Sequence, residues 1–551
     1  MTNTRRKWRR LDFWHIICIV LLVFAVMFIC YPFLYLFTNS VSSDSGITFA
    51  HYAKFFKKHY YMVCLTNTLK LALCSTVLAT IVGLPLAYIA TRFNTWGKSF
   101  THILVVISLM SPPFIGAYAW ILLLGNNGYI TNWLAAAGIH IGSIYGFHGL
   151  LLVFTLKLYP FVYLYAQGAL QKIDASLEEA SESLGVHGMQ RIMKVTFPVI
   201  LPTILNSMLM VFMTSIADYG TPQMIGKSYK VLTVAIYEEF MSEMLGDTSF
   251  ASALAVMITI CMLLLLVIQK TSIANKSYRM SALRPPQQVK LHGAKRFFAS
   301  LPLYVIGLLG LLPILAIVYT SFRKVNGTRF AEGFGLDSYR TVFHTMGRFT
   351  RNTFVMSVIA ILSVMLIALL ASYLIVRRRS KASGLLDIMF MFPYVIPGSV
   401  VGISMVVAFN KKPIILTGTF LIIIVAYIIR KLPFTLRSSV GILYQIDPAI
   451  EEASISLGVP PMKTFFKTTT PQMLPGLCSG AVLSFIEIIN ELSASMILYT
   501  GKTTTISVAI FNSLFRDAYG TAAALATILT VVTVVCLLLF NRFSGGRSFV
   551  G

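Results

Sequence analysis

Long apolar runs recur along the whole chain and decide its fold class. A helix of about 20 residues crosses the hydrocarbon core of a bilayer and satisfies its own backbone hydrogen bonds there. We therefore predict an all-α, polytopic membrane protein with about 12 transmembrane helices. The predicted spans lie near residues 14–37, 63–90, 102–124, 147–168, 195–217 and 250–269, then 300–320, 353–376, 385–408, 413–430, 474–498 and 520–541.

Composition agrees with a membrane protein. Of the 551 residues, 56% are hydrophobic and only 12% are charged, about half the charged fraction of a soluble domain. The first apolar run, from about His15 to Phe37, is too long for a signal-peptide core, and no small-residue cleavage site follows it. We expect this run to remain as a helix.

The net charge of +25 resembles that of a nucleic-acid-binding protein, but most of the basic residues flank apolar spans. Basic loops of this kind stay in the cytoplasm and face anionic lipid. Arg5 to Arg10 place the amino terminus inside, and residues 270–296 carry seven Lys or Arg and no acid. Both termini are then cytoplasmic, with membrane lipid and not nucleic acid as the partner. One loop disagrees, since 321–352 should lie outside yet has six basic residues.

No catalytic or metal-binding constellation is visible. The seven cysteines are scattered through apolar sequence without a CxxC pair, and the nine histidines show no pair at metal-ligand spacing, so buried packing is the favoured interpretation of the cysteines. Fragments 226–228 and 501–503 resemble the end of a P-loop but lack its first glycine. We therefore predict that the chain is not an enzyme and binds no nucleotide.

A polar segment occurs twice. Residues 173–202 and 446–475 align at an offset of 273, and 16 of the 30 positions are identical. Each copy falls between the fourth and fifth span of its half, which predicts two parallel six-helix repeats related by an axis along the membrane normal. We assign 1–280 to the first repeat, 281–298 to a basic cytoplasmic linker and 299–551 to the second repeat.

Each copy is expected to form a short helix, a turn and a second helix. Asp174 or Ser176 can cap the first helix, and Ser176 with Glu179 matches a capping box. In the second copy Asp447 precedes Pro448. Gly185 and Gly458 stand where the helix must stop in a left-handed turn. A rigid polar element of this kind is suited to a groove on a soluble partner.

These segments resemble the EAA loop of ABC-importer permeases, whose pattern is EAA, three residues, glycine, nine residues and I-x-L-P. Both copies have serine at the third position, and the second copy loses the apolar I-x-L residues. The resemblance implies a type I importer fold in a bacterial inner membrane. It also implies two copies of a cytoplasmic ABC ATPase that carries the ATP and Mg²⁺, no cofactor on this chain, and a periplasmic or lipid-anchored substrate-binding protein. The implied coupling residues are Glu178, Glu179, Ala180, Gly185, Glu451, Glu452, Ala453 and Gly458. We expect the two loops to bind with unequal strength.

Further strings resemble fused permeases of ferric iron importers. They are Ser111-Pro112-Pro113-Phe114, Gly116-Ala117-Tyr118-Ala119-Trp120, Tyr159-Pro160-Phe161 and Asp218-Tyr219-Gly220-Thr221-Pro222. Permeases for thiamine, phosphonates and polyamines share parts of this pattern and stay open as alternatives. An ion-coupled secondary transporter with parallel six-helix repeats is the alternative from another class.

Acidic residues within predicted spans are candidates for the translocation path, because they are costly in a membrane unless they function there. Glu487 and Glu491 lie on one helix face with Asn490 adjacent, and Asp218 corresponds to Glu491 in the first repeat. Fe³⁺ is a hard cation that prefers oxygen ligands. The alternative interpretation is that neighbouring helices hold these acids in a structural role, which we favour for Asp218.

Overall fold

The computed structural model describes residues 13–43, 46–110, 113–242, 247–274, 288–326 and 329–543, and these are almost entirely helical. The strands form two short antiparallel hairpins, β1 (Ser42–Ser43) with β2 (Gly46–Ile47) and β3 (Arg323–Asn326) with β4 (Arg329–Phe334). The predicted all-α membrane fold is confirmed. Arg5 to Arg10, Ser111, Pro112 and residues 281–287 of the predicted linker lie outside the described residues.

Both halves of the chain are built from helices of similar order. The first half contains α1 (Phe13–Ala25), α2 (Tyr31–Ser40), α3 (Ala50–Lys57), α4 (His59–Arg92), α5 (Lys98–Met110), α6 (Pro113–Leu124), α7 (Tyr129–Ala136), α8 (Phe147–Gln171), α9 (Ala175–Ser183), α10 (Gly188–Arg191), α11 (Phe197–Ala217), α12 (Gly220–Ile225), α13 (Leu232–Met241) and α14 (Thr248–Ala274). The second half contains α15 (Gly293–Ser321), α16 (Asp337–Thr345), α17 (Gly347–Val376), α18 (Lys381–Met391), α19 (Gly398–Phe409), α20 (Phe420–Gln445), α21 (Ala449–Ser456), α22 (Pro461–Thr464), α23 (Thr470–Ile489), α24 (Ser495–Leu498), α25 (Ile506–Phe515) and α26 (Tyr519–Phe543).

A helix or a helix pair occupies each of the twelve predicted spans. Within the described residues, nine helices are long and apolar enough to cross a membrane, and one bent pair makes ten. The remaining two places hold α5 with α6, between which residues 111–112 lie outside the described residues, and α20, which contains Arg430, Lys431 and Arg437. The described residues therefore have helical structure at all twelve predicted places, but not twelve continuous apolar helices.

The third span of the second half is broken, where a single helix over 385–408 was predicted; the single helix predicted over 102–124 contains residues 111–112, which lie outside the described residues. In the second half α18 passes through a 3₁₀ turn and bends by 111° before α19 begins. Pro393 and Pro397 account for this break, because proline lacks an N–H donor and collides with the preceding helical turn. In the first half α5 ends at Met110 and α6 begins at Pro113.

Two predicted spans in the second half have wrong bounds. The span predicted at 413–430 is α20, which begins at Phe420 and continues past Arg430 to Gln445. The helix continues because Arg430 and Lys431 are neutralised by ion pairs and need not end it. The span predicted at 474–498 ends earlier, at Ile489, where the Glu491 carboxylate accepts a hydrogen bond from the Ala494 N–H and turns the chain into α24.

Each half has an equivalent three-helix core, α4 with α8 and α11 in the first and α17 with α20 and α23 in the second. Small hydroxyl side chains join these helices, as is common where lipid gives no hydrophobic drive for association. The hydroxyl oxygens of Ser75 on α4 and Ser215 on α11 lie 3.1 Å apart. Thr435 and Ser484 lie 2.7 Å apart between α20 and α23.

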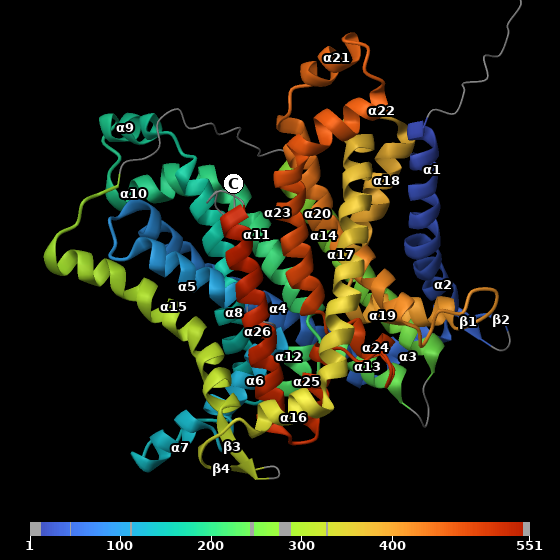
Figure 1. Ribbon diagram of the computed structural model, residues 1–551. Helices are drawn as coiled ribbons and strands as arrows, with labels where there is room; N and C mark the ends of the chain where they lie inside the picture. The colour runs from blue at the N-terminus through green and yellow to red at the C-terminus, as the bar shows by residue number, and fades with distance from the viewer. Residues whose placement is uncertain are drawn as a thin grey trace, which may run out of the picture.

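The first helix of each half packs against the other half. α1 contacts α17 and α18, and α2 contacts α19, whereas α15 contacts α5, α6 and α8. Figure 1 shows α1 beside α18 at the right and α15 beside α5 at the left. The Trp14 ring lies 4.4 Å from the Tyr373 ring and 4.8 Å from the Phe465 ring. This exchange ties the two halves into one bundle.

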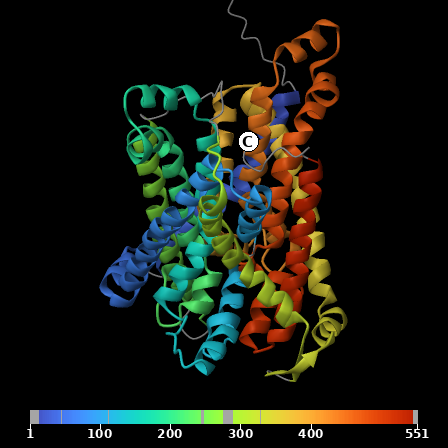
Figure 2. The same ribbon diagram turned by 90° about the vertical axis from the view of Figure 1, so that its left-hand side faces the viewer.

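The repeated loops lie at one end of the bundle. Figures 1 and 2 place α9, α10, α21 and α22 at the upper end, together with the start of α1 and the end of α26. The β3–β4 hairpin, α7 and α16 lie at the opposite end. The basic loop 321–352, which disagreed with the charge rule, is therefore on the side that helix counting predicted. The residues before α15 are bound to the first half, since the Val289 N–H donates to the Arg92 carbonyl at 2.8 Å.

The helix exchange predicts that Trp14 stabilises the whole bundle. Trp14→Ala should lower the free energy of unfolding by about 3 kcal/mol, because it removes a buried aromatic side chain without allowing the site to collapse. Thermal unfolding of the detergent-solubilised chain measures this change. Trp133→Ala is the matched control, since Trp133 is 72% exposed on α7. Equal shifts in melting temperature for both variants would contradict the packing described.

Candidate functional site

The two repeated loops begin with the same cap. The Asp174 carboxylate accepts a hydrogen bond from the Ser176 N–H at 2.9 Å, and the Asp447 carboxylate accepts one from the Ala449 N–H at 2.9 Å. The cap is therefore Asp174, one of the two predicted residues. The Ser176–Glu179 capping box was wrong, because α9 begins at Ala175 and Ser176 lies inside the helix.

Both helices end in the same turn, as predicted. Gly185 has a φ of +78° and Gly458 a φ of +82°. The Val186 N–H donates to the Ser181 carbonyl at 2.9 Å, and the Val459 N–H donates to the Ser454 carbonyl at 3.2 Å, the hydrogen bond of a Schellman motif. An added Cβ would meet no atom within 4 Å at either glycine. The backbone conformation alone therefore requires glycine here.

One glutamate of each loop is bound to the end of a core helix. Arg92 of α4 forms an ion pair with Glu178, and Arg377 of α17 forms one with Glu451 at 3.1 Å. In the second loop Tyr373 also donates to Glu451 at 3.1 Å. Arg92 and Glu451 are both more than nine-tenths buried. Each loop is thus attached to a core helix of its own half.

The remaining residues of the predicted coupling set face outward. Glu179, Ala180, Glu452 and Ala453 are all exposed, unlike Glu178 and Glu451. The predicted set therefore divides into residues that attach the loop to the bundle, residues that shape its turn, and residues that are free to contact a partner.

Apolar side chains at equivalent positions are also exposed on the loops. Leu184 and Leu457 have exposed fractions of 82% and 84%. Three further pairs at the same offset are exposed: Leu177 with Ile450, Met189 with Met462, and Met193 with Phe466. Exposed apolar side chains repeated on two polar loops indicate a surface that another protein covers.

The two loops differ in how their helices are joined. In the first loop Arg191 of α10 forms an ion pair with Glu182 of α9. The equivalent positions in the second loop are Thr464 and Ile455. There Thr464 instead lies 3.0 Å from the Ser454 hydroxyl. The loops are therefore similar in shape but unequal in chemistry.

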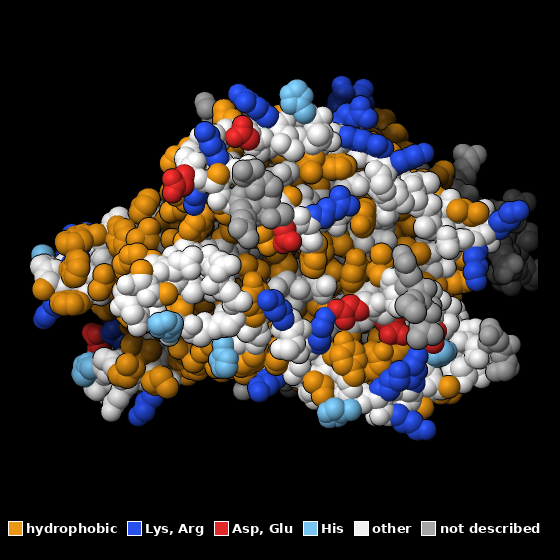
Figure 3. Space-filling view, turned by 90° about the horizontal axis from the view of Figure 1, so that it is seen from below, with side chains coloured by type: hydrophobic (Ala, Val, Ile, Leu, Met, Phe, Trp, Pro, Cys, Tyr) orange, Lys and Arg blue, Asp and Glu red, His pale blue; other side chains and the backbone are white. Residues whose placement is uncertain are grey.

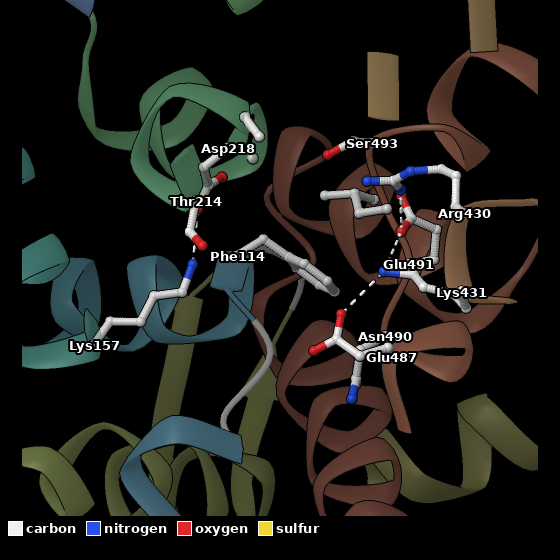
Figure 4. Close-up of a pocket in the computed structure, with 13 residues that line it drawn as sticks. Phe114, Lys157, Thr214, Asp218, Arg430, Lys431, Glu487, Asn490, Glu491 and Ser493 are labelled. Carbon is white, nitrogen blue, oxygen red and sulfur yellow. Dashed lines mark hydrogen bonds and ion pairs between the residues drawn. The ribbon is translucent and has the colours of Figure 1, made fainter. Parts of the chain in front are cut away.

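The candidate path residues line a cavity between the two halves. It has a volume of about 150 Å³ and lies at the ends of α11 and α23, away from the repeated loops. All four predicted residues line it: Asp218, Glu487, Asn490 and Glu491. Three basic residues line it as well: Lys157, Arg430 and Lys431. Figure 4 shows Phe114 between the Lys157–Asp218 pair and the group around Lys431.

Every acid in the cavity has a cationic partner. The Lys157 ammonium nitrogen lies 2.8 Å from a carboxylate oxygen of Asp218, and Arg430 forms an ion pair with Glu491. Lys431 lies 2.9 Å from Glu487 and 3.2 Å from Glu491. Asp218 and Glu491 are buried, whereas the Glu487 side chain is 53% exposed. Among the described residues, no three His, Cys, Asp or Glu side chains are grouped so that they could hold a metal ion.

The halves approach each other closely beside this cavity. A Cβ on Gly220 would lie 3.0 Å from Leu492 of the second half and 3.0 Å from the Phe114 side chain. Gly220 thus permits the contact between α12 and the opposite repeat.

The basic partners of these acids were not among the residues predicted from the sequence, although the repeat contains a signal for them. Arg92 and Arg377 are 285 positions apart, the offset that also relates Asn67 to Asn352. Lys157 and Arg430 are 273 positions apart, the offset of the repeated loops. Basic residues that recur at the offsets of the repeat were therefore candidates for ion pairs.

A family model matches the chain twice, once in each half. The family described as "Binding-protein-dependent transport system inner membrane component" matches residues 79–275 and 363–547. The ferric transport system permease protein FbpB of Actinobacillus pleuropneumoniae is 30% identical over 96% of this chain and 78% of its own length. A putative 2-aminoethylphosphonate transport system permease protein of Salmonella typhimurium is 30% identical over 30% of this chain and 62% of its own length. A solved bacterial alginate ABC transporter chain gives a TM-score of 0.40 at 17% identity, covering 48% of this chain and 96% of that chain.

The attachment of the loops predicts unequal effects of removing each arginine. Arg92→Ala should increase amide hydrogen exchange across α9 roughly tenfold, because it leaves the carboxylate of Glu178 without its counter-ion. Arg377→Ala should affect α21 less, because Tyr373 still binds Glu451. Hydrogen–deuterium exchange with mass spectrometry measures both. Arg340→Ala, at an exposed pair with Asp337 at 3.8 Å, is the control. Faster exchange in α21 than in α9 would contradict the assignment.

Proposed function

The chain belongs to the family of binding-protein-dependent transport system inner membrane components, and we propose on this basis that it is the fused permease subunit of an ATP-driven importer of ferric iron. The relative named as a ferric transport permease aligns with nearly the whole chain. The phosphonate permease relative aligns with less than a third of it. Ferric iron is therefore favoured over phosphonate, whereas thiamine and polyamine stay open as alternatives, and family membership disfavours an ion-coupled secondary transporter.

Two copies of an ABC ATPase are proposed to bind α9 and α21. The observation that carries this proposal is the pair of loops that share a cap, a Schellman turn and exposed leucines at one offset. One chain thus offers two similar docking elements. ATP and Mg²⁺ would be held by the ATPase, since neither P-loop-like fragment of this chain is complete. The loop end, with both termini, would then face the cytoplasm of a bacterium.

A periplasmic or lipid-anchored substrate-binding protein is proposed to dock on the opposite end. Figure 3 looks onto that end and shows Lys, Arg and His side chains around its rim, with acidic side chains between them. A surface of mixed charge suits a transient partner that binds and leaves in each cycle. Ferric iron released there would enter the cavity between the halves. Transport would follow when the ATPases move α9 and α21, and with them α4 and α17.

Docking through the exposed leucines predicts a loss of ATPase binding. Leu184→Asp and Leu457→Asp should each reduce the amount of ATPase subunit that co-purifies with the chain, by about tenfold in the double variant, because a charge then faces an apolar cleft. Folding should not change, since both side chains are exposed. Leu336→Asp, exposed at the opposite end, is the matched control. Retention of ATPase by the double variant would refute this docking surface.

The left-handed glycines predict a second result. Gly185→Pro or Gly458→Pro should abolish ATP-dependent ferric uptake, because proline fixes φ near −65° and cannot adopt the turn. Gly185→Ala should retain partial uptake, since a left-handed alanine costs about 1 kcal/mol. Uptake into proteoliposomes is compared with the amount of protein inserted. Normal uptake by the proline variants would show that this turn has no part in coupling.

A further inference from the structure

The ion pairs of the cavity are of two kinds. Lys157–Asp218 in the first half and Arg430–Glu491 in the second are equivalent, since both partners are related by the offset of 273. Lys431–Glu487 has no such counterpart, because Leu158 and Thr214 stand at the equivalent positions.

The repeated pairs have a structural role that explains their duplication. Asp218 accepts a hydrogen bond from the Thr221 N–H at 3.1 Å, and Glu491 accepts one from the Ala494 N–H at 3.1 Å. Both carboxylates thus shape the turn that leads from a core helix into α12 or α24. Both are buried, and their charges are compensated by Lys157 and Arg430. They are not free to bind a passing ion.

The Lys431–Glu487 pair differs from the two repeated pairs in its structural role and in its burial. The first half folds with leucine and threonine in its place, so the architecture does not require it. The Glu487 side chain is half-exposed, whereas the Lys431 side chain is 7% exposed. Close by, Asn490 lines the same cavity, and its side-chain oxygen is buried without a hydrogen-bond donor among the described residues. Carboxylate and amide oxygens are the ligands that hard cations prefer.

We propose that Glu487, assisted by the Asn490 side-chain oxygen, contacts the hard trivalent cation in transit, and that Lys431 is the resident counter-ion which this cation displaces. The inference rests on the proposed function and assigns the contact within it. At equal distance, the attraction between a carboxylate and a trivalent ion is about three times the attraction between a carboxylate and an ammonium group.

The displacement leaves no buried charge unpaired. Lys431 also lies 3.2 Å from Glu491, so its ammonium group keeps a carboxylate partner when it leaves Glu487. Glu491 in turn retains Arg430. Pairing between Lys431 and Glu487 in the empty cavity would also lower the affinity of the site for monovalent cations, which attract the carboxylate no more strongly than Lys431 does.

A set of three variants tests this inference against a structural role for the pair. The full transporter, with its ATPase and binding protein, is reconstituted in proteoliposomes, and radioactive ferric uptake is measured beside ATP hydrolysis. Glu487→Gln should reduce the uptake rate about tenfold, as expected for loss of one charged contact, while ATP hydrolysis stays within about twofold of normal. Lys431→Met should still transport. The double variant should be as slow as Glu487→Gln.

A structural pair predicts a different pattern. In that case Lys431→Met would be as slow as Glu487→Gln, and the double variant would regain uptake. Either result would overturn the inference. Normal uptake by Glu487→Gln would also overturn it. Asp337→Asn, a loss of the same charge on α16 outside the cavity, controls for general electrostatic effects. A wild-type transporter that takes up no ferric iron with ATP would instead refute the proposed function itself.

Discussion

The pairing of buried carboxylates with basic side chains is the constraint on which the rest of this structure depends. A charge between membrane helices is tolerated only when it is neutralised. Arg92 and Arg377 satisfy this condition at one end of the bundle, where they bind Glu178 and Glu451. Lys157 and Arg430 satisfy it at the cavity, where they bind Asp218 and Glu491. The same type of interaction thus fixes the loops and the cavity that a transporter must connect.

The two halves share many features, whereas others are present in one half alone. In the cavity, the ion pairs present in both halves shape the turns that lead into α12 and α24 and so maintain the architecture. On the loops, the repeated caps and glycine turns give the two proposed docking elements the same shape. Features present once have no such explanation. Lys431 with Glu487 in the cavity and Glu182 with Arg191 in the first loop are of this second kind. The proposed cation contact and the proposed inequality of the two ATPase contacts both rest on this distinction.

Local features of the fold were predictable from sequence, and non-local ones were not. Apolar runs located the helices, and the offset of 273 located both loops with their caps and turns. The break between α18 and α19 was also encoded, because Pro393 and Pro397 stand at the bend, but an apolar-run criterion does not weigh proline. The exchange of α1 and α15 between the halves depends on packing such as that of Trp14 on Tyr373 and Phe465. No pattern within one segment specifies such a contact.

In the proposed complex, one chain presents two attachment points for an ATPase, each connected to a core helix. Native mass spectrometry of the complex purified from membranes tests this arrangement most directly, because the mass gives the number of subunits. We expect one copy of this chain with two copies of the ATPase, and partial dissociation at low energy that removes one ATPase before the other. A complex with a single ATPase, or a chain purified from intact membranes with none, would contradict it.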